Sequence, residues 1–150
     1  MLEVHGANLE YQTETFKAGI SELSTPLQKK GIVQWIGPYE ASQLATLMRN
    51  VDWVVVPSVW WENSPMVIQE ALALGRPVIV SDIGGMAEKV VDGVNGRHVP
   101  VGNVNAWGRM LTELARDAQG WDRLHAGIVK PITYGQCAEA HLELMPKASQ

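Results

Sequence analysis

The chain has 150 residues, of which 46% are apolar, and its formal net charge is -4. This length and apolar content suit one domain of ordinary size with a single core. The twelve lysine and arginine residues are spread along the sequence, and the largest cluster is the pair Lys29–Lys30. A basic patch is therefore missing, which argues against nucleic acid as a partner.

Cysteine and histidine residues indicate neither a disulfide framework nor a metal centre. Cys137 is the single cysteine, so no disulfide can form within the chain, and a reducing compartment fits. The four histidines lack metal-ligand spacing, so we expect no metal. The apolar runs are far shorter than the roughly 20 residues that span a bilayer, and the N-terminus lacks a signal-peptide pattern. We expect a cytoplasmic protein, and peripheral attachment at the inner face of a membrane stays compatible with the sequence.

Short runs rich in Val, Ile and Trp predict four β-strands in the first half of the chain. These runs lie at residues 2–5, 32–36, 53–56 and 77–80. The second and third are nearly continuous in apolar residues, which is typical of parallel strands buried on both faces. Helical patterns follow the first three runs, at about residues 9–23, 40–49 and 65–74. The alternation predicts an α/β fold, a doubly wound, Rossmann-like, mostly parallel sheet with helices on both faces.

The second half continues this order and then changes character. A Gly84–Gly85 pair and a short helix lead through Asp-Gly and Asn-Gly turns to a brief strand at 97–99. A helix is predicted at about 104–118, and a second helical run at 136–145 follows a break at Pro131. The apolar residues of that last run have no obvious place on the sheet. We therefore divide the chain into a Rossmann-like domain, residues 1–118, and a helical tail, residues 119–150.

The segment ENSPMVIQE, residues 62–70, follows the third predicted strand and opens a helix. In doubly wound sheets, ligands bind where loops leave the carboxyl ends of the strands. Pro65 suits the first helical position, with Ser64 or Asn63 as the cap. The backbone from Ser64 through Pro65 and Met66 to Val67 would then turn its N–H groups toward that edge. Together with the helix dipole, they suit a phosphate or diphosphate.

Glu70 is the only charge in a helix that is apolar nearly all round, so we expect it to be buried on several sides. Burying a carboxylate without a polar partner destabilises the folded state by roughly several kcal/mol, the desolvation penalty of an ion. A ribose diol would satisfy it. The alternative is that Glu70 bonds a nearby backbone donor or reaches solvent.

Glu62 lies in the loop before this helix, where its carboxylate could reach a group beside the phosphates. The alternative is a charge that only favours the helix dipole. Directly before it, Trp60 and Trp61 could form a stacking wall for a sugar or an acceptor. The alternative for these aromatic side chains is packing against neighbouring helices.

Four segments together resemble the family 4 glycosyltransferases, whose enzymes have the two-domain GT-B fold. They are IGPYE (36–40), VDWVVVPS (51–58), ENSPMVIQEALALGRPVIVSDIGGMAE (62–88) and DGVNG (92–96). The similarity covers most of residues 32–101. By this resemblance the second glutamate of an E-x7-E motif, Glu70, holds the ribose of a nucleotide, and Glu62 with Asn63 contacts the donor sugar.

The resemblance implies further contacts around these two carboxylates. The amides of residues 64–67 would bind the diphosphate, and Gly37 with Pro38 would lie near the nucleobase. The Gly84–Gly85 turn and Glu88 would line the edge of the same site.

The sequence departs from the family pattern in two places. Many members have Gly-Phe-Gly after the first glutamate, where this chain has Asn63-Ser64-Pro65. The Arg and Lys that the family uses for the diphosphate, in the first strand-loop-helix of this domain, have no counterpart here. The N-terminal, acceptor-binding GT-B domain has none either, so we expect a part of a longer enzyme whose tail crosses back to that domain.

The function implied is sugar transfer, with retention, from a nucleoside diphosphate sugar to a glycan, lipid or small-molecule acceptor. Positioning and stabilisation of the leaving diphosphate would carry catalysis, with no cofactor and no metal. No paired carboxylates of the kind used in glycoside hydrolysis are found, so Glu62 is not assigned as a nucleophile. The alternatives are a nucleotide-sugar epimerase, for which no acid–base pair is found, and a non-catalytic binding module.

Overall fold

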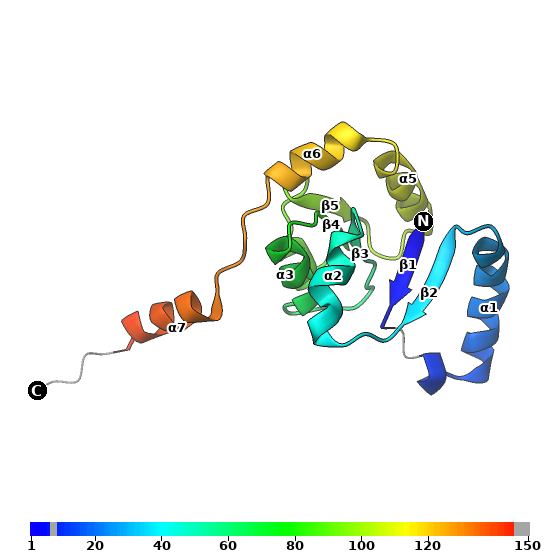
Figure 1. Cartoon of the computed structure of the whole chain (residues 1–150), viewed down its shortest axis with the longest axis horizontal. Coiled ribbons are helices and arrows are strands. Elements are labelled where there is room, and N and C mark those ends of the chain that lie inside the picture. Colours follow the sequence, from blue (N-terminus) through cyan, green and yellow to red (C-terminus); the bar gives the residue numbers. More distant parts are fainter. Residues whose placement is uncertain (7–8, 146–150) are drawn as a thin grey trace, which may run out of the picture. The chain divides into compact units, whose positions relative to one another are not determined.

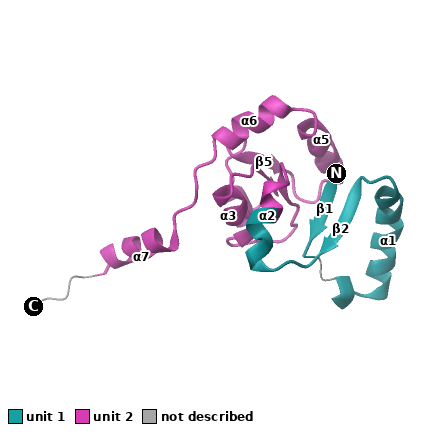
Figure 2. Ribbon diagram, viewed as in Figure 1, with its two compact units in different colours: residues 1–46 teal, residues 47–150 magenta. Residues whose placement is uncertain are grey.

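The computed structural model describes residues 1–6 and 9–145 (Figure 1). The chain divides into two compact units, residues 1–46 and residues 47–150 (Figure 2). Both units are built from parallel strands and helices, so the predicted α/β class is confirmed. The expected division at residue 118 stays a prediction.

The first unit is a parallel strand pair joined by a helix. Strand β1 (Leu2–His5) pairs with β2 (Val33–Gly37), and α1 (Glu14–Lys29) makes the connection that parallel strands require. Thr13 sets the start of α1, because its Oγ1 accepts a hydrogen bond from the Phe16 amide at 3.3 Å. Helix α1 therefore begins later and ends later than predicted. No described residue of this unit is buried.

The second unit contains a three-stranded parallel sheet in the order β3-β4-β5. Its strands are β3 (Val54–Val56), β4 (Val78–Ser81) and β5 (Gly96–Val99). Helix α3 (Met66–Ala73) lies between β3 and β4 in the chain, and α4 (Gly84–Lys89) lies between β4 and β5. The carboxyl ends of the three strands therefore share one edge, where the loops after Val56 and Ser81 begin.

Strand β4 is the centre of the core. All four of its residues are completely buried, since β4 has a strand on each side. Ile79 packs with Val99 and with Leu114 of α5 (Val104–Leu114). The prediction that the second and third strands are buried on both faces was wrong. In β2 half-buried and exposed residues alternate, and β3 is half-buried throughout. Strand β4 packs against both α3 and α4, whereas β3 packs against α3 and lies at the edge of its sheet.

Five further helical segments complete the described chain. They are η2 (Ala41–Gln43), α2 (Leu44–Arg49), α6 (Ala118–Ala126) and α7 (Tyr134–Glu143), with a short 3-10 turn, η1, at Leu9–Tyr11. The helix predicted at 104–118 ends at Leu114, and a separate helix that was not predicted follows it, because Asp117 caps α6 by accepting from the Gly120 amide at 2.7 Å. No helix of the described residues is long and apolar enough to cross a membrane.

Helix α6 is tied to the loops at the amino ends of β3 and β4. Trp121 donates from Nε1 to the Asp52 carbonyl at 2.8 Å, and His125 Nδ1 lies 2.8 Å from the Gly75 carbonyl oxygen. The two rings stack with their centroids 4.7 Å apart. In contrast, α7 buries none of its residues.

Candidate functional site

The candidate site in the second unit lies at the carboxyl edge of its sheet, where two segments meet. The Gly85 amide at the start of α4 donates to the Glu62 carbonyl at 2.7 Å. A Cβ atom on Gly85 would overlap the Asn63 carbonyl group, so only glycine allows this approach. Residues separated by more than twenty positions in sequence are thus brought into backbone contact.

Glu62 is held at three points. Its amide donates to the Trp60 carbonyl at 2.9 Å, and its carbonyl accepts from Gly85. Its Oε1 accepts from the Ser58 hydroxyl at 3.3 Å. A carboxylate has about four acceptor positions, so most of this group stays free for a ligand.

The predicted cap of α3 was wrong. Helix α3 begins at Met66, and Pro65 occupies the cap position without a side-chain hydrogen bond to the helix. The Ser64 hydroxyl does not cap the helix, because it accepts from Gln69 Nε2 at 3.1 Å instead. Pro65 keeps an extended ψ of 120°, which places it just outside the helix.

The start of α3 leaves backbone N–H groups free. Within the described residues, the amides of Asn63, Ser64, Met66 and Val67 have no hydrogen-bond acceptor, whereas Ile68 donates to the Pro65 carbonyl at 3.3 Å. Pro65 itself has no N–H group. The free amides and the positive end of the helix dipole together suit an anion.

Glu70 lies on a helix that buries one face only. Ile68, Ala71 and Leu72 are buried, whereas Met66 is 63% exposed. The expectation that α3 is buried on several sides was therefore wrong. Glu70 is half-buried, and within the described chain its carboxylate has no hydrogen-bond or ion-pair partner. Burial by itself therefore does not force Glu70 to bind a ligand.

Trp60 and Trp61 are each 73% exposed. The Trp61 indole lies over Gly84, with Nε1 3.2 Å from the position that a Cβ atom would take there. Trp61 therefore contacts one neighbouring helix at Gly84, in line with the packing alternative, although most of both rings is exposed. They stand at the surface beside the Glu62 loop.

The remaining predicted residues are placed as follows. In the second unit, Gly84 has a φ of +53° and opens α4, and Glu88 is exposed on that helix. In the first unit, Gly37 ends β2 with a φ of +88°, and Pro38 follows it. The second unit thus gathers Glu62, Asn63, Gly84 and Gly85 around one backbone contact.

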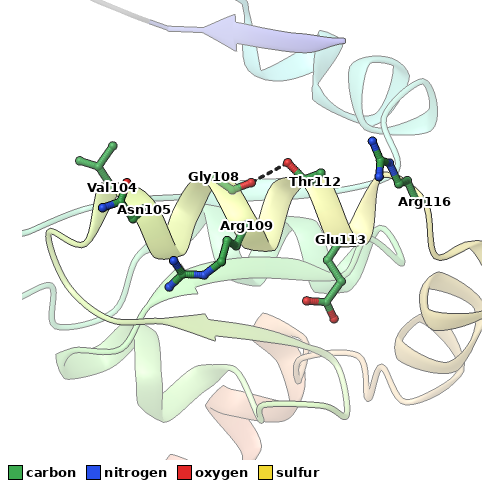
Figure 3. A pocket seen from close by; sticks show the side chains of 7 residues that line it. All are labelled: Val104, Asn105, Gly108, Arg109, Thr112, Glu113 and Arg116. Carbon is green, nitrogen blue, oxygen red and sulfur yellow. Dashed lines mark hydrogen bonds between the residues drawn. The ribbon is translucent and has the colours of Figure 1, made fainter.

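A shallow hollow follows one face of α5, and it contains none of the predicted site residues (Figure 3). The Thr112 hydroxyl in it donates to the Gly108 carbonyl at 2.7 Å, and Glu113 lies 3.8 Å from Arg97. The residues of this hollow are Val104, Asn105, Gly108, Arg109, Thr112, Glu113 and Arg116. Since a single helix lines it, we do not assign it to the donor site.

Two contacts near the site were missed by sequence reasoning. Ser58 orients the Glu62 carboxylate, and His98 of β5 lies beside Asp82, with Nδ1 and Oδ1 3.3 Å apart. The sequence pattern assigns His98 no role, since the histidines lack metal-ligand spacing. No motif spacing could have shown either contact, because both depend on how loops fold back on the strands.

A known family matches most of the chain. The model of the family described as glycosyl transferases group 1 matches residues 10–126. This chain belongs to that family. The family resemblance of the sequence is thereby confirmed.

Curated relatives are longer than this chain. The D-inositol 3-phosphate glycosyltransferase of Salinispora arenicola is 32% identical over 136 residues, covering 80% of this chain and 30% of that protein. That of Mycobacterium tuberculosis strain H37Ra is 34% identical over 102 residues, covering 68% of this chain and 21% of that protein. The chain therefore spans less than a third of the length of these relatives.

Solved structures share the fold. Anabaena HepE in complex with UDP-glucose has a TM-score of 0.75 at 23% identity, covering 95% of this chain and 40% of that one. A glycosyltransferase from Rickettsia africae has a TM-score of 0.77 at 18% identity, covering 95% of this chain and 38% of that one. These similarities show a Rossmann-like α/β fold that corresponds to one half of a GT-B architecture.

Proposed function

We propose that this member of the group 1 glycosyl transferases forms the donor half-site of a retaining enzyme and binds a nucleoside diphosphate sugar. The observation that carries the proposal is the row of free amides at the start of α3, beside a carboxylate that the fold holds in place. The complex of HepE with UDP-glucose, in a protein of the same fold, supports this class of ligand.

The free amides of Ser64, Met66 and Val67 take the diphosphate in this proposal, with the positive end of α3 behind them. Pro65 cannot take part through an N–H group, although its fixed φ helps to shape the turn. The Asn63 amide is also free and lies next to the sugar contacts of Glu62. Glu70 follows one turn into α3 and binds the ribose hydroxyls as acceptor.

The proposal also includes the other contacts that the family resemblance implies. Gly37 and Pro38 lie near the nucleobase, and Gly84, Gly85 and Glu88 form the edge of the site. The donor supplies the reacting bond, so no cofactor or metal takes part.

Transfer with retention places the acceptor next to the anomeric carbon, whose bond to the diphosphate breaks as the bond to the acceptor forms. The amides stabilise the negative charge that develops on the leaving diphosphate. The acceptor, a glycan, a lipid or a small molecule, binds to the N-terminal domain of the whole enzyme. The tail from residue 119 crosses back to that domain, and residues 1–150 alone are inactive.

A thermal-shift screen of nucleoside diphosphates and their sugars tests donor binding by this chain. A ligand at about 100 times its dissociation constant adds about 2.7 kcal/mol of stability, so the matching nucleotide raises Tm clearly. Nucleoside monophosphates serve as the control, since they lack the second phosphate. If no nucleoside diphosphate or its sugar shifts Tm, the donor-site proposal fails.

Labelled-donor turnover by the longer enzyme separates transfer from the two alternatives. Transfer of the label to an acceptor supports the transferase. Epimerised donor with no transfer would support an epimerase, and binding without turnover would support a non-catalytic module.

A further inference from the structure

The ring of His98 contacts both ends of the α4 segment. On one side, Nδ1 lies 3.3 Å from Oδ1 of Asp82, which precedes α4 by two residues. On the other side, Nε2 lies 2.7 Å from the carbonyl oxygen of Val90, the C-cap residue of α4. One side chain on β5 therefore contacts the residues that flank this short helix at both ends.

Both partners of the ring are acceptors. The Val90 carbonyl has only lone pairs, and an ionised Asp82 carboxylate cannot donate. A neutral imidazole has one N–H group, which can serve the Val90 carbonyl, whereas the imidazolium also has the positive charge that forms an ion pair with the Asp82 carboxylate. The neutral ring that donates to Val90 turns a lone pair toward the Asp82 carboxylate.

The charged groups around His98 belong to three segments. Asp92, in the turn before β5, accepts from the His98 amide at 2.8 Å and from Arg97 Nε at 3.2 Å. Glu113 of α5 lies 3.8 Å from Arg97. Successive side chains of a strand point to opposite faces, so Arg97 and His98 face different sides of β5. Among the described residues, Asp82 is the charged side chain that faces the ring nitrogens.

The other end of this arrangement is the donor site. Gly85, in the first turn of α4, is pressed against the Glu62–Asn63 backbone and donates to the Glu62 carbonyl at 2.7 Å. The space between the two segments does not admit even a methyl group. A shift of α4 must therefore move the Glu62 loop.

We propose that His98 is a positioning residue of the donor site: when protonated it ties Asp82 to Val90, fixes α4 and so holds Glu62 in place for the donor. This inference rests on the proposed function for the role of Glu62. The link to Asp82 exists while His98 is protonated, and it is lost when the ring is neutral. Donor affinity is therefore lower with the neutral ring.

The first test follows the Gly85 amide by NMR in the full chain without ligand, from about pH 5 to about pH 8, where histidine titrates. In the wild type, the Gly85 signal moves with the same midpoint as the His98 ring signals. In His98→Gln this movement disappears. The control is His125→Gln, which removes the ring that meets the Gly75 carbonyl and should leave the Gly85 titration unchanged.

Asp82→Asn is the second variant, and it keeps the packing of the ring. The Asn side chain has no charge, so it forms no ion pair with His98, while the contact of Nε2 with Val90 stays. The link to residue 82 is then absent at every pH, and the Gly85 signal no longer depends on pH. A Gly85 signal that still titrates in both His98→Gln and Asp82→Asn would overturn the proposal.

UDP-glucose binding to the same variants separates this inference from the proposed function. In the wild type the dissociation constant rises about fivefold or more over this pH range, at the lower end of the coupling seen between sites in proteins. The rise is absent in Asp82→Asn. An equal rise in Asp82→Asn would overturn the inference while leaving donor binding intact. If UDP-glucose does not bind but Gly85 still follows His98, the donor assignment fails and the positioning of α4 is supported.

Discussion

The two glutamates of the ENSPMVIQE segment differ in how the fold holds them. Glu62 is fixed by two backbone hydrogen bonds and by the Ser58 hydroxyl. Its loop meets α4 at Gly85, where no residue larger than glycine fits. Glu70 stands half-buried on α3 with no partner in the described chain. The sequence pattern predicts the stronger constraint at Glu70, because an apolar helix is expected to bury it.

This difference suggests a division of roles. A group that positions a reacting sugar benefits from being held before the ligand arrives, since misplacement by about 1 Å can cost about a hundredfold in rate. A group that only binds a ribose does not need to be held in position before the ligand binds. Substitutions at the two glutamates and at their neighbours test this division.

Gly85→Ala should have the largest effect, because the added methyl group overlaps the Asn63 carbonyl and must push the Glu62 loop away. We expect the affinity for the nucleotide sugar to fall by more than about a hundredfold, with a lower Tm, measured by calorimetry and thermal unfolding. Gly108→Ala is the matched control, since its Cβ meets nothing within 4 Å and alanine favours a helix. Full donor affinity in Gly85→Ala would show that the loop need not be held.

Glu70→Ala should remove charged hydrogen bonds worth about 1.5 to 3 kcal/mol if Glu70 binds the ribose. The affinity then falls by about 10-fold to 150-fold, and equally for the nucleoside diphosphate and its sugar. Equilibrium titration of both ligands measures this, with Glu139→Ala on α7 as the exposed control. An unchanged dissociation constant would remove Glu70 from the site.

Glu62→Gln should affect the sugar alone. The Gln side chain can still accept from Ser58, so the loop stays in place while the charge is lost. We expect a loss of about 1 kcal/mol, or about fivefold, in the affinity for the nucleotide sugar and no change for the nucleoside diphosphate. Equal losses for both ligands would contradict the division between the two glutamates.

Trp60→Ala should have the smallest effect on stability, within about 0.5 kcal/mol, because the ring is 73% exposed. The predicted role of Trp60 is stacking on a sugar or acceptor, and titration of the variant with the nucleotide sugar measures it. Trp121→Ala is the contrast, since it loses the hydrogen bond to Asp52 and the stack on His125 and should lower Tm. A large loss of stability in Trp60→Ala would show that the ring packs against the fold.

Much of the architecture could be predicted from the sequence, because it depends on local patterns. The runs at 2–5, 53–56 and 77–80 are strands, the parallel α/β order is as predicted, and the motifs placed the chain in its family. The errors concern degree of burial and helix ends. A run of apolar residues shows that a strand is buried but not how many neighbours it has, which is why β4 and not β3 is the centre.

The sequence predicted which residues form the candidate site but not their contacts. The structure brings Glu62 and Asn63 together with Gly84 and Gly85. Composition and spacing determined the carboxyl edge of the sheet, the amides at the start of α3 and the two glutamates as candidates. Only the tertiary structure decided that α3 buries one face, that Gly85 meets Glu62 and that His98 spans α4. These contacts join residues far apart in the chain, and side-chain periodicity, a property of neighbours in sequence, contains no information about which distant backbone a glycine or a histidine will meet.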